Sequence, residues 1–277
     1  MTGLLMLSTA AFRGHPLRFS VAVRALAGLL AVASTSLAAA ATPQGKPAAL
    51  ATAEVHVIVA LVDNASQGIV PVPASIGNGD DPASNLYWGA AYGLKTFLSR
   101  APHWRRLNCQ LNVSDSILER CVFSYKGDTL RLTAEAWRGK HIDRAMLAFM
   151  QQAATPPRKS TVREMIAFVG HNGLMDLKHQ SMPDRFARHG THAKMAVILA
   201  CQSDAYFRSH LLAAGAHPVV TTFSLMAPEG YVMEAIAREF AQPSADLEQV
   251  MRRSAGDAYA KFQKISARAG RRVFGAR

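Results

Sequence analysis

The chain has 277 residues, of which 49% are hydrophobic, and this composition excludes a wholly disordered protein. It suits one globular domain with a sizeable core. The formal net charge of +12 is concentrated at the two ends, because residues 1–41 carry three arginines and residues 252–277 carry a net +7. The central body keeps only about +2, so we expect no nucleic-acid-binding domain.

The first 41 residues have the pattern of a secretory signal. Arginines precede the acid-free apolar run "ALAGLLAVASTSLAAAA", which ends in small residues at Ala41. The run is short for a membrane span and no charged stop follows it; the alternative is a buried or anchoring N-terminal helix. We expect a signal peptide over 1–41, a linker over 42–54, and a mature protein that is periplasmic or secreted and has no transmembrane segment.

Beyond residue 54, stretches with the pattern of buried strands alternate with stretches of helical periodicity. The predicted strands cover 55–63, the hairpin 117–125 and 129–137, then 164–170, 194–200 and 217–223. The predicted helices cover 85–100, which begins at an Asn85 N-cap, then 141–154, 202–214, 229–240 and 244–265. This alternation predicts an α/β fold, a three-layer α/β/α sandwich with a mostly parallel central sheet, over residues 55–242. A basic helical segment follows over 243–277, either a solvated helix end or a contact for an acidic surface.

Two of the three cysteines lie where a bridge is possible. Cys109 and Cys121 flank the turn-like stretch "QLNVSDSILER", so we expect them to face each other across a hairpin. A disulfide that closes so short a loop stabilises the protein by about 3 kcal/mol at most. Cys201 then remains unpaired, and it is either a reactive thiol or a buried inert one.

Cys201 and His171 each stand at the end of a predicted strand. Cys201 ends the run "AVILA", and His171 follows "IAFVG" in "GHNGLMD". Loops at the carboxyl ends of the strands converge in open α/β sheets, so neighbouring strands would bring imidazole and thiol together. An adjacent base and the start of the helix after Cys201 both favour the thiolate. This pattern predicts nucleophilic chemistry.

The two strand-end motifs, His171-Asn172-Gly173 and Leu199-Ala200-Cys201-Gln202-Ser203, resemble those of the caspase-like cysteine peptidases of clan CD. That family includes caspases, metacaspases, legumains, gingipains and clostripain. The segments "VDNASQGIVPVP", "GNGDDPASNLYWGAAYG" and "LMAPEGY" resemble an uncharacterised bacterial branch of it. The resemblance implies Cys201 as nucleophile, His171 as general base and acid, and an oxyanion hole from the backbone N–H of Cys201 and that of Asn172 or Gly173.

The sequence departs from the family's pattern at one specificity position. Enzymes of this type that cut after Lys or Arg tend to carry an acid two residues before the cysteine, where this chain has Leu199. Candidate substrate-binding residues elsewhere follow the first strand or lie in the long loop after it, although such residues more often serve turns and caps: Asp63, Asn64, Asp80 and Asp81.

No cofactor or metal site is expected. His179, His189 and His192 lie at irregular spacing in a polar loop without cysteine or carboxylate at ligand spacing, which favours solvated histidines. We therefore expect a caspase-like cysteine endopeptidase that acts on a peptide or protein substrate. The alternative is a catalytically inactive protein of the same fold that binds a partner through the loops "GIVPVP" and "GNGDDP".

Overall fold

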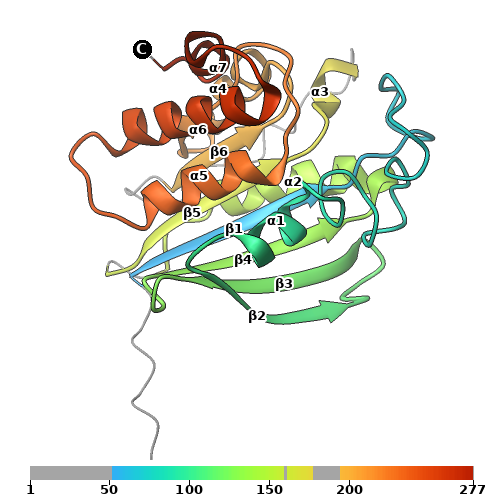
Figure 1. The fold of residues 1–277 in the computed structure, drawn as a ribbon, viewed down its shortest axis with the longest axis horizontal. Helices are drawn as coiled ribbons and strands as arrows, with labels where there is room; N and C mark the ends of the chain where they lie inside the picture. Colours follow the sequence, from blue (N-terminus) through green and yellow to red (C-terminus); the bar gives the residue numbers. More distant parts are fainter. Residues whose placement is uncertain (1–51, 159–160, 177–193, 277) are drawn as a thin grey trace, which may run out of the picture. The chain divides into compact units, whose positions relative to one another are not determined.

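The computed structural model describes residues 52–158, 161–176 and 194–276 (Figure 1). All of them belong to one compact unit, Lys46–Arg277, which is distinct from the unit Met1–Gly45. The predicted signal peptide, most of the predicted linker, and the three histidines of the polar loop lie outside the described residues.

A seven-stranded mixed sheet forms the centre of the unit (Figure 1). The strands are β1 (Ala53–Ala60), β2 (Trp104–Leu111), β3 (Ile117–Tyr125), β4 (Leu130–Trp137), β5 (Arg163–Val169), β6 (Met195–Leu199) and β7 (His217–Val220). Their order across the sheet is β2-β3-β4-β1-β5-β6-β7. Strand β4 and the four strands β1, β5, β6 and β7 are mutually parallel, and β2 and β3 add an antiparallel ribbon at one edge.

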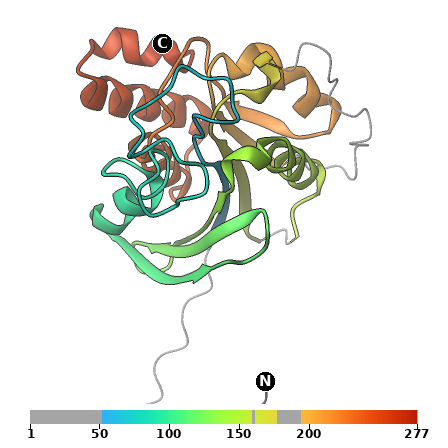
Figure 2. The same ribbon diagram turned by 90° about the vertical axis from the view of Figure 1, so that its right-hand side faces the viewer.

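Helices cover both faces of the sheet and give three layers (Figure 2). They are α1 (Leu94–Arg100), the 3-10 helix η1 (Gly139–His141), α2 (Ile142–Ala154), α3 (Gly173–Asp176), α4 (Ser203–Ala213), α5 (Gly230–Phe240), α6 (Leu247–Gln263) and α7 (Ala267–Val273). One face packs against α1, α5, α6 and α7, and the other against α2 and α4. The predicted α/β class is confirmed.

The period of two along β1 explains how one strand serves both layers. Val55, Val57 and Val59 belong to the core on the α1 and α5 face, whereas Ile58 and Ala60 belong to the core on the α2 and α4 face. Side chains of a strand alternate between the two faces, so the part of a strand that is covered on both sides is apolar, as Val57–Ala60 is. Glu54 and His56, near the start of the strand, are only half-buried. The continuous apolar run of the sequence therefore becomes a central strand, which begins at Ala53.

The helix predicted over 85–100 is wrong in its first half, because α1 begins only at Leu94. Asn85 does not cap it. Its side-chain amide donates to the carbonyls of Val62 (2.8 Å) and Asn78 (2.9 Å), and its oxygen accepts from the N–H of Val62. A buried loop must satisfy its backbone polar groups, and here Asn85 does so across 23 residues of sequence.

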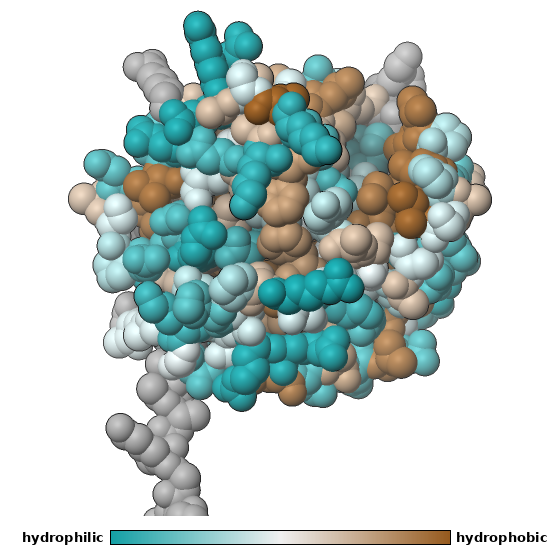
Figure 3. Space-filling model, in the orientation of Figure 1, coloured by the Kyte–Doolittle hydropathy of each residue, from teal (hydrophilic) through white to brown (hydrophobic). Residues whose placement is uncertain are grey.

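The C-terminal segment packs onto the same core as the sheet. Met251 and Tyr259 of α6 and Phe274 after α7 are all buried in the cluster that also holds β1. Arg252 and Arg271 are paired with Glu248 and Asp257. Much of the surface over α6 and α7 is hydrophilic in Figure 3, and the exposed basic residues there are Arg253, Lys261, Lys264, Arg268 and Arg272. Among the described residues, none of the helices has the length and apolar character that a membrane crossing needs.

Candidate active site

His171 and Cys201 follow neighbouring parallel strands at the same level. The last register pair of β5 and β6 joins Val169 with Leu199, and the N–H of Gly170 donates to the carbonyl of Leu199 at 3.1 Å. His171 and Cys201 each come two positions after that pair, and both are half-buried. The backbone thus brings the two predicted catalytic residues to one edge of the sheet.

Asn172 ties the two strand ends together. Its side-chain amide donates to the carbonyl of Cys201 at 2.6 Å, and its oxygen accepts from the N–H of Leu174 at 3.1 Å. The side chain is fully buried. Gly173, also buried, begins α3 so close to α2 that a Cβ would lie 2.8 Å from the methyl group of Met146. These contacts fix the loop after His171 against the turn that carries Cys201.

The turn after β6 is held by a second set of hydrogen bonds. The hydroxyl of Ser203 donates to the carbonyl of Ile198 at 2.8 Å and accepts from the N–H of Thr222 at 2.9 Å. Gln202 adopts the left-handed conformation with φ of 49°, which turns the chain from β6 into α4. Cys201 therefore lies directly before the N-terminus of the eleven-residue helix α4.

The thiol of Cys201 contacts the loop between β7 and α5. The N–H of Met226 lies 3.4 Å from Sγ and its carbonyl oxygen 3.5 Å from it. Ala227 donates its N–H to the hydroxyl of Tyr259 at 3.2 Å, which fastens this loop to α6. A donor N–H stabilises a thiolate, whereas the carbonyl accepts the proton of a neutral thiol.

Two tyrosines interact electrostatically with the cysteine, and Glu229 interacts with both of them. Burial, followed by the charges of Cys201 and Glu229, raises the pKa of Tyr87. Burial also raises the pKa of Tyr259, against the N–H of Ala227 that lowers it. The pKa of Glu229 is raised by burial too, although hydrogen bonds from Tyr231 and Gln263 oppose this shift. The thiol thus has neutral phenols in its electrostatic surroundings.

Three of the four candidate substrate-binding residues make contacts within the long loop, and the fourth, Asp80, pairs with the distant Arg138. Asp63 accepts from the N–H of Ala65 and from the hydroxyl of Ser66. Three similar arrangements complete the set: Asn64 bonds the backbone of Val72 in both directions, Asp80 pairs with Arg138, and Asp81 accepts from Ser84 and from the N–H of Ala83. The hydrogen bond from Ser84 is the main reason that the pKa of Asp81 is lowered. These contacts shape the long loop.

Sequence reasoning did not identify the residues that contact or surround the thiol from the far loop and from α6. Met226 and Glu229 both fall within "LMAPEGY", which the resemblance included without assigning a role. Tyr87 and Tyr259 carry no local signal, because their aromatic spacing is equally typical of packing.

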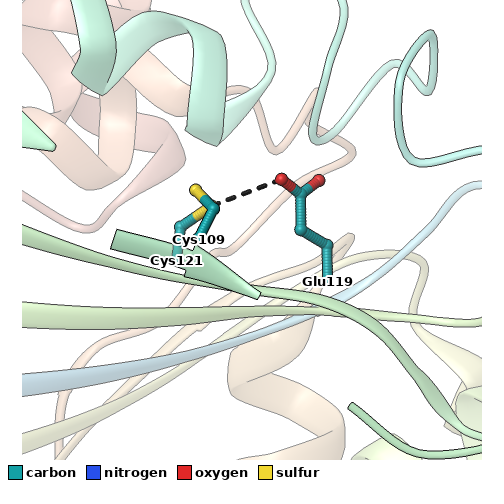
Figure 4. Close-up of side chains that lie close together, drawn as sticks. All are labelled: Cys109, Glu119 and Cys121. Carbon is teal, nitrogen blue, oxygen red and sulfur yellow. Dashed lines mark hydrogen bonds between the residues drawn. A yellow bond between two sulfur atoms is a disulfide. The ribbon is translucent and has the colours of Figure 1, made fainter. Parts of the chain in front are cut away.

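The predicted hairpin pairing of Cys109 with Cys121 is confirmed at the other end of the sheet. The two residues are register partners on β2 and β3, with Cα atoms 4.1 Å apart and a disulfide between them. Within the described part of the chain, one group of metal-ligating side chains lies within 4.8 Å, namely these cysteines and Glu119 (Figure 4). The disulfide occupies both sulfurs, so this group offers a metal no thiolate.

Comparison of the chain with known proteins identified no relative. No protein-family model matches the chain, and neither a curated protein nor a solved structure matches it. The function must therefore come from the chemistry of the site itself.

Proposed function

We propose that this chain is an exported caspase-like cysteine endopeptidase with Cys201 as nucleophile and His171 as general base and acid. The observation that carries the proposal is the common level of the two residues at the ends of adjacent parallel strands, β5 and β6. The bond from Asn172 to the carbonyl of Cys201 supports it, because it holds the two loops together. Residues that act on one carbonyl must converge in this way.

The reaction would proceed in two stages. His171 accepts the thiol proton, the sulfur attacks the peptide carbonyl, and the C–N bond breaks as the amine takes that proton. A water molecule, deprotonated by His171, then hydrolyses the thioester and releases the acid and the free thiol. The oxyanion would be stabilised by the backbone N–H of Cys201 and that of Asn172 or Gly173; within the described part of the chain, no backbone hydrogen bond uses any of these three groups.

The thiol must leave its contact with the carbonyl of Met226 when it ionises. A carbonyl oxygen 3.5 Å from Sγ repels a thiolate, whereas the Met226 N–H at 3.4 Å attracts it. Rotation of Sγ away from that carbonyl would keep the N–H contact and turn the sulfur toward the substrate. Asp63, Asn64, Asp80 and Asp81 would contribute to substrate binding through the loop that they shape.

Alkylation of the mature protein tests the proposal. With iodoacetamide and a peptidyl fluoromethyl ketone, we expect labelling at Cys201, and His171→Ala should slow it at least about 100-fold because a general base contributes that much. Cys201→Ala should abolish it. His210→Ala, a change at a half-buried histidine of α4, is the matched control and should leave the rate unchanged. Melting temperatures establish that each variant is folded.

The same experiment separates the enzyme from an inactive binding protein. The bonds of the thiol to both backbone groups of Met226 favour that second candidate, because a thiol engaged in this way reacts slowly. Slow labelling that His171→Ala does not change would rule out the peptidase and leave the binding protein.

Export is the remaining part of the proposal. The Cys109–Cys121 disulfide is compatible with an extracytoplasmic location, where such bridges persist. We expect the purified native protein to begin near Thr42. N-terminal sequencing that finds Met1 intact would contradict export.

A further inference from the structure

The disulfide joins the two strands at one edge of the sheet, and Cys201 of the candidate active site follows a strand near the opposite edge. Strand β2 is the outermost strand of the antiparallel ribbon, and β6 lies four strands beyond β3. The two sulfurs differ in access, because Cys109 is half-buried and Cys121 is completely buried. A reagent can therefore approach the sulfur of Cys109 first.

A cavity of about 750 Å³ borders the accessible sulfur. Its lining includes Lys95, Arg106, Leu107, Cys109, Leu111 and Glu119. Leu107 and Leu111 are 36% and 64% exposed on the edge strand. An exposed apolar rim with basic side chains beside a sulfur suits a peptide that carries a thiol.

Glu119 places a carboxylate at the buried sulfur. Glu119 and Cys121 are two positions apart on β3, so their side chains share one face of the sheet (Figure 4). The Oε1 atom of Glu119 lies 3.5 Å from Sγ of Cys121. The sulfur carries no hydrogen while the disulfide is closed, so this contact becomes a hydrogen bond only when Cys121 is a thiol.

Burial of the Glu119 carboxylate carries a desolvation cost, so its position suggests a function beyond packing. It is 4% exposed, and its other oxygen accepts from Trp88 Nε1 at 2.6 Å and from Lys95 Nζ at 2.8 Å. A buried carboxylate needs such partners, and an apolar residue would serve a purely structural disulfide at lower cost. The two donors hold the carboxylate in place while Oε1 stays directed at the sulfur.

We propose that Cys109–Cys121 is a redox-active pair that exchanges disulfides with thiol-bearing peptides or proteins, with Glu119 as its proton acceptor. When a mixed disulfide joins Cys109 to the partner, Glu119 takes the proton of the Cys121 thiol. The thiolate attacks Sγ of Cys109, the Cys109–Cys121 bond forms, and the partner leaves as a thiolate that takes the proton from Glu119. The reverse sequence opens the pair. A partner with two thiols is then oxidised to a disulfide as the pair is reduced, a transfer of two electrons.

Glutathione is the probe for this activity. The Cys201→Ala protein is used as background so that no third thiol takes part, and a chelator is present because reduced Cys109 and Cys121 with Glu119 have ligand spacing for a metal. We expect glutathione to open the pair while the protein stays folded by circular dichroism. For the two single-cysteine variants the probe is oxidised glutathione, because a free thiol forms a mixed disulfide only by exchange with a disulfide. In Cys121→Ser, one half of it should remain attached to Cys109 as the other half leaves as reduced glutathione, whereas Cys109→Ser should leave the buried Cys121 unmodified.

Glu119→Gln measures the role of the carboxylate. Mass spectrometry should find the mixed disulfide on Cys109 closing at least about tenfold more slowly, because the Cys121 thiol loses its base. Glu164→Gln, which alters a carboxylate on β5 that is 7% exposed and paired with Lys194, is the matched control and should close at the unaltered rate.

Three results would overturn the proposal: a pair that glutathione cannot open in the folded protein, equal trapping at Cys109 and Cys121, or unchanged closure in Glu119→Gln. The two cysteine variants decide the question even if Glu119→Gln fails to fold.

Discussion

Glu119 on β3 and Glu135 on the neighbouring strand β4 are buried carboxylates on opposite faces of the sheet, and their surroundings differ. Glu135 uses both oxygens: Oε1 accepts from Arg120 at 2.8 and 2.7 Å, and Oε2 accepts from Trp137 at 3.0 Å. In Glu119, Oε2 accepts hydrogen bonds from both Trp88 and Lys95, whereas Oε1 lies beside the disulfide. A buried carboxylate with every oxygen bonded only stabilises the fold, whereas one with a free oxygen at a sulfur can move a proton.

The largest expected effect comes from removing the fully bonded carboxylate. Glu135→Ala leaves Arg120, His56 and Trp137 without their acceptor, three groups against the two that Glu119 serves. Arg120 is 38% exposed and can turn toward water, so we expect a loss of about 3 kcal/mol in the free energy of unfolding. Urea denaturation measures it. Glu54→Ala, at a carboxylate whose side chain is 43% exposed, serves as control and should change stability by less than about 0.5 kcal/mol.

The pH dependence of stability follows from the same group. Burial alone would raise the pKa of Glu135, but His56, Arg120 and Trp137 outweigh it and lower the pKa from 4.5 to about 2. The folded protein thus holds the charged form more strongly than the unfolded chain does. Its stabilisation, about 2 to 3 kcal/mol, is complete above pH 4.5 and lost as the pH falls toward 2. Urea titrations at several pH values should show this acid limb, and Glu135→Gln should flatten it.

Removing the carboxylate at the disulfide should cost less. In Glu119→Ala, Lys95 can turn its ammonium toward water, because its side chain is already 19% exposed, and only Trp88 keeps a buried unpaired donor. We expect a loss of about 2 kcal/mol in the free energy of unfolding. A loss as large as that of Glu135→Ala would mean that Glu119 is as fully structural as its counterpart, and the contrast between the faces would disappear.

The smallest effect concerns one donor to the fully bonded group. Trp137→Phe removes the hydrogen bond to Oε2 of Glu135 but leaves both contacts from Arg120. We expect a loss of about 1 kcal/mol in calorimetry, with the acid limb retained. Disappearance of the acid limb in this variant would show that Trp137, rather than His56 and Arg120, sets the pKa of Glu135.

Six of the seven strands could be predicted from the sequence, because strand patterns are local. The runs at 55–63, 164–170, 194–200 and 217–223 and the hairpin at 117–137 correspond to β1, β5, β6, β7 and the pair β3 and β4. Strand β2 was not among the predicted strands. The pairing of Cys109 with Cys121 followed from a turn of polar residues between them. Helix α7 was not separated from the helix predicted over 244–265 and its basic continuation, because the left-handed residue Lys264 that divides them has no local signal.

The surroundings of the sites could not be predicted, because they depend on contacts between distant parts of the chain. Residues 86–93 have helical spacing, yet they form turns instead of a helix. The side chain of Asn85, at their start, donates a hydrogen bond to the carbonyl of Val62 instead of capping a helix. In the sequence, Glu119 is only one polar residue of a predicted hairpin strand, and its contacts with Trp88 and Lys95 form only in the folded protein. Likewise, Met226 reaches Cys201 across 25 residues. Periodicity reports which face is buried, not which distant donor meets a given acceptor.

The outermost strand, β2, has a consequence for self-association. One side of an edge strand carries unpaired N–H and C=O groups that can recruit a strand from another molecule. The charges of Arg105 and Arg106 and the register irregularity before Asn108 oppose such recruitment. The bridge at Cys109 adds a covalent lock, since it prevents β2 from sliding or peeling away to expose β3 as a second, more apolar edge. Prolonged reduction of the disulfide would leave β2 free to separate from β3, so we expect slow aggregation through intermolecular β-sheet under those conditions, whereas brief opening leaves the fold intact.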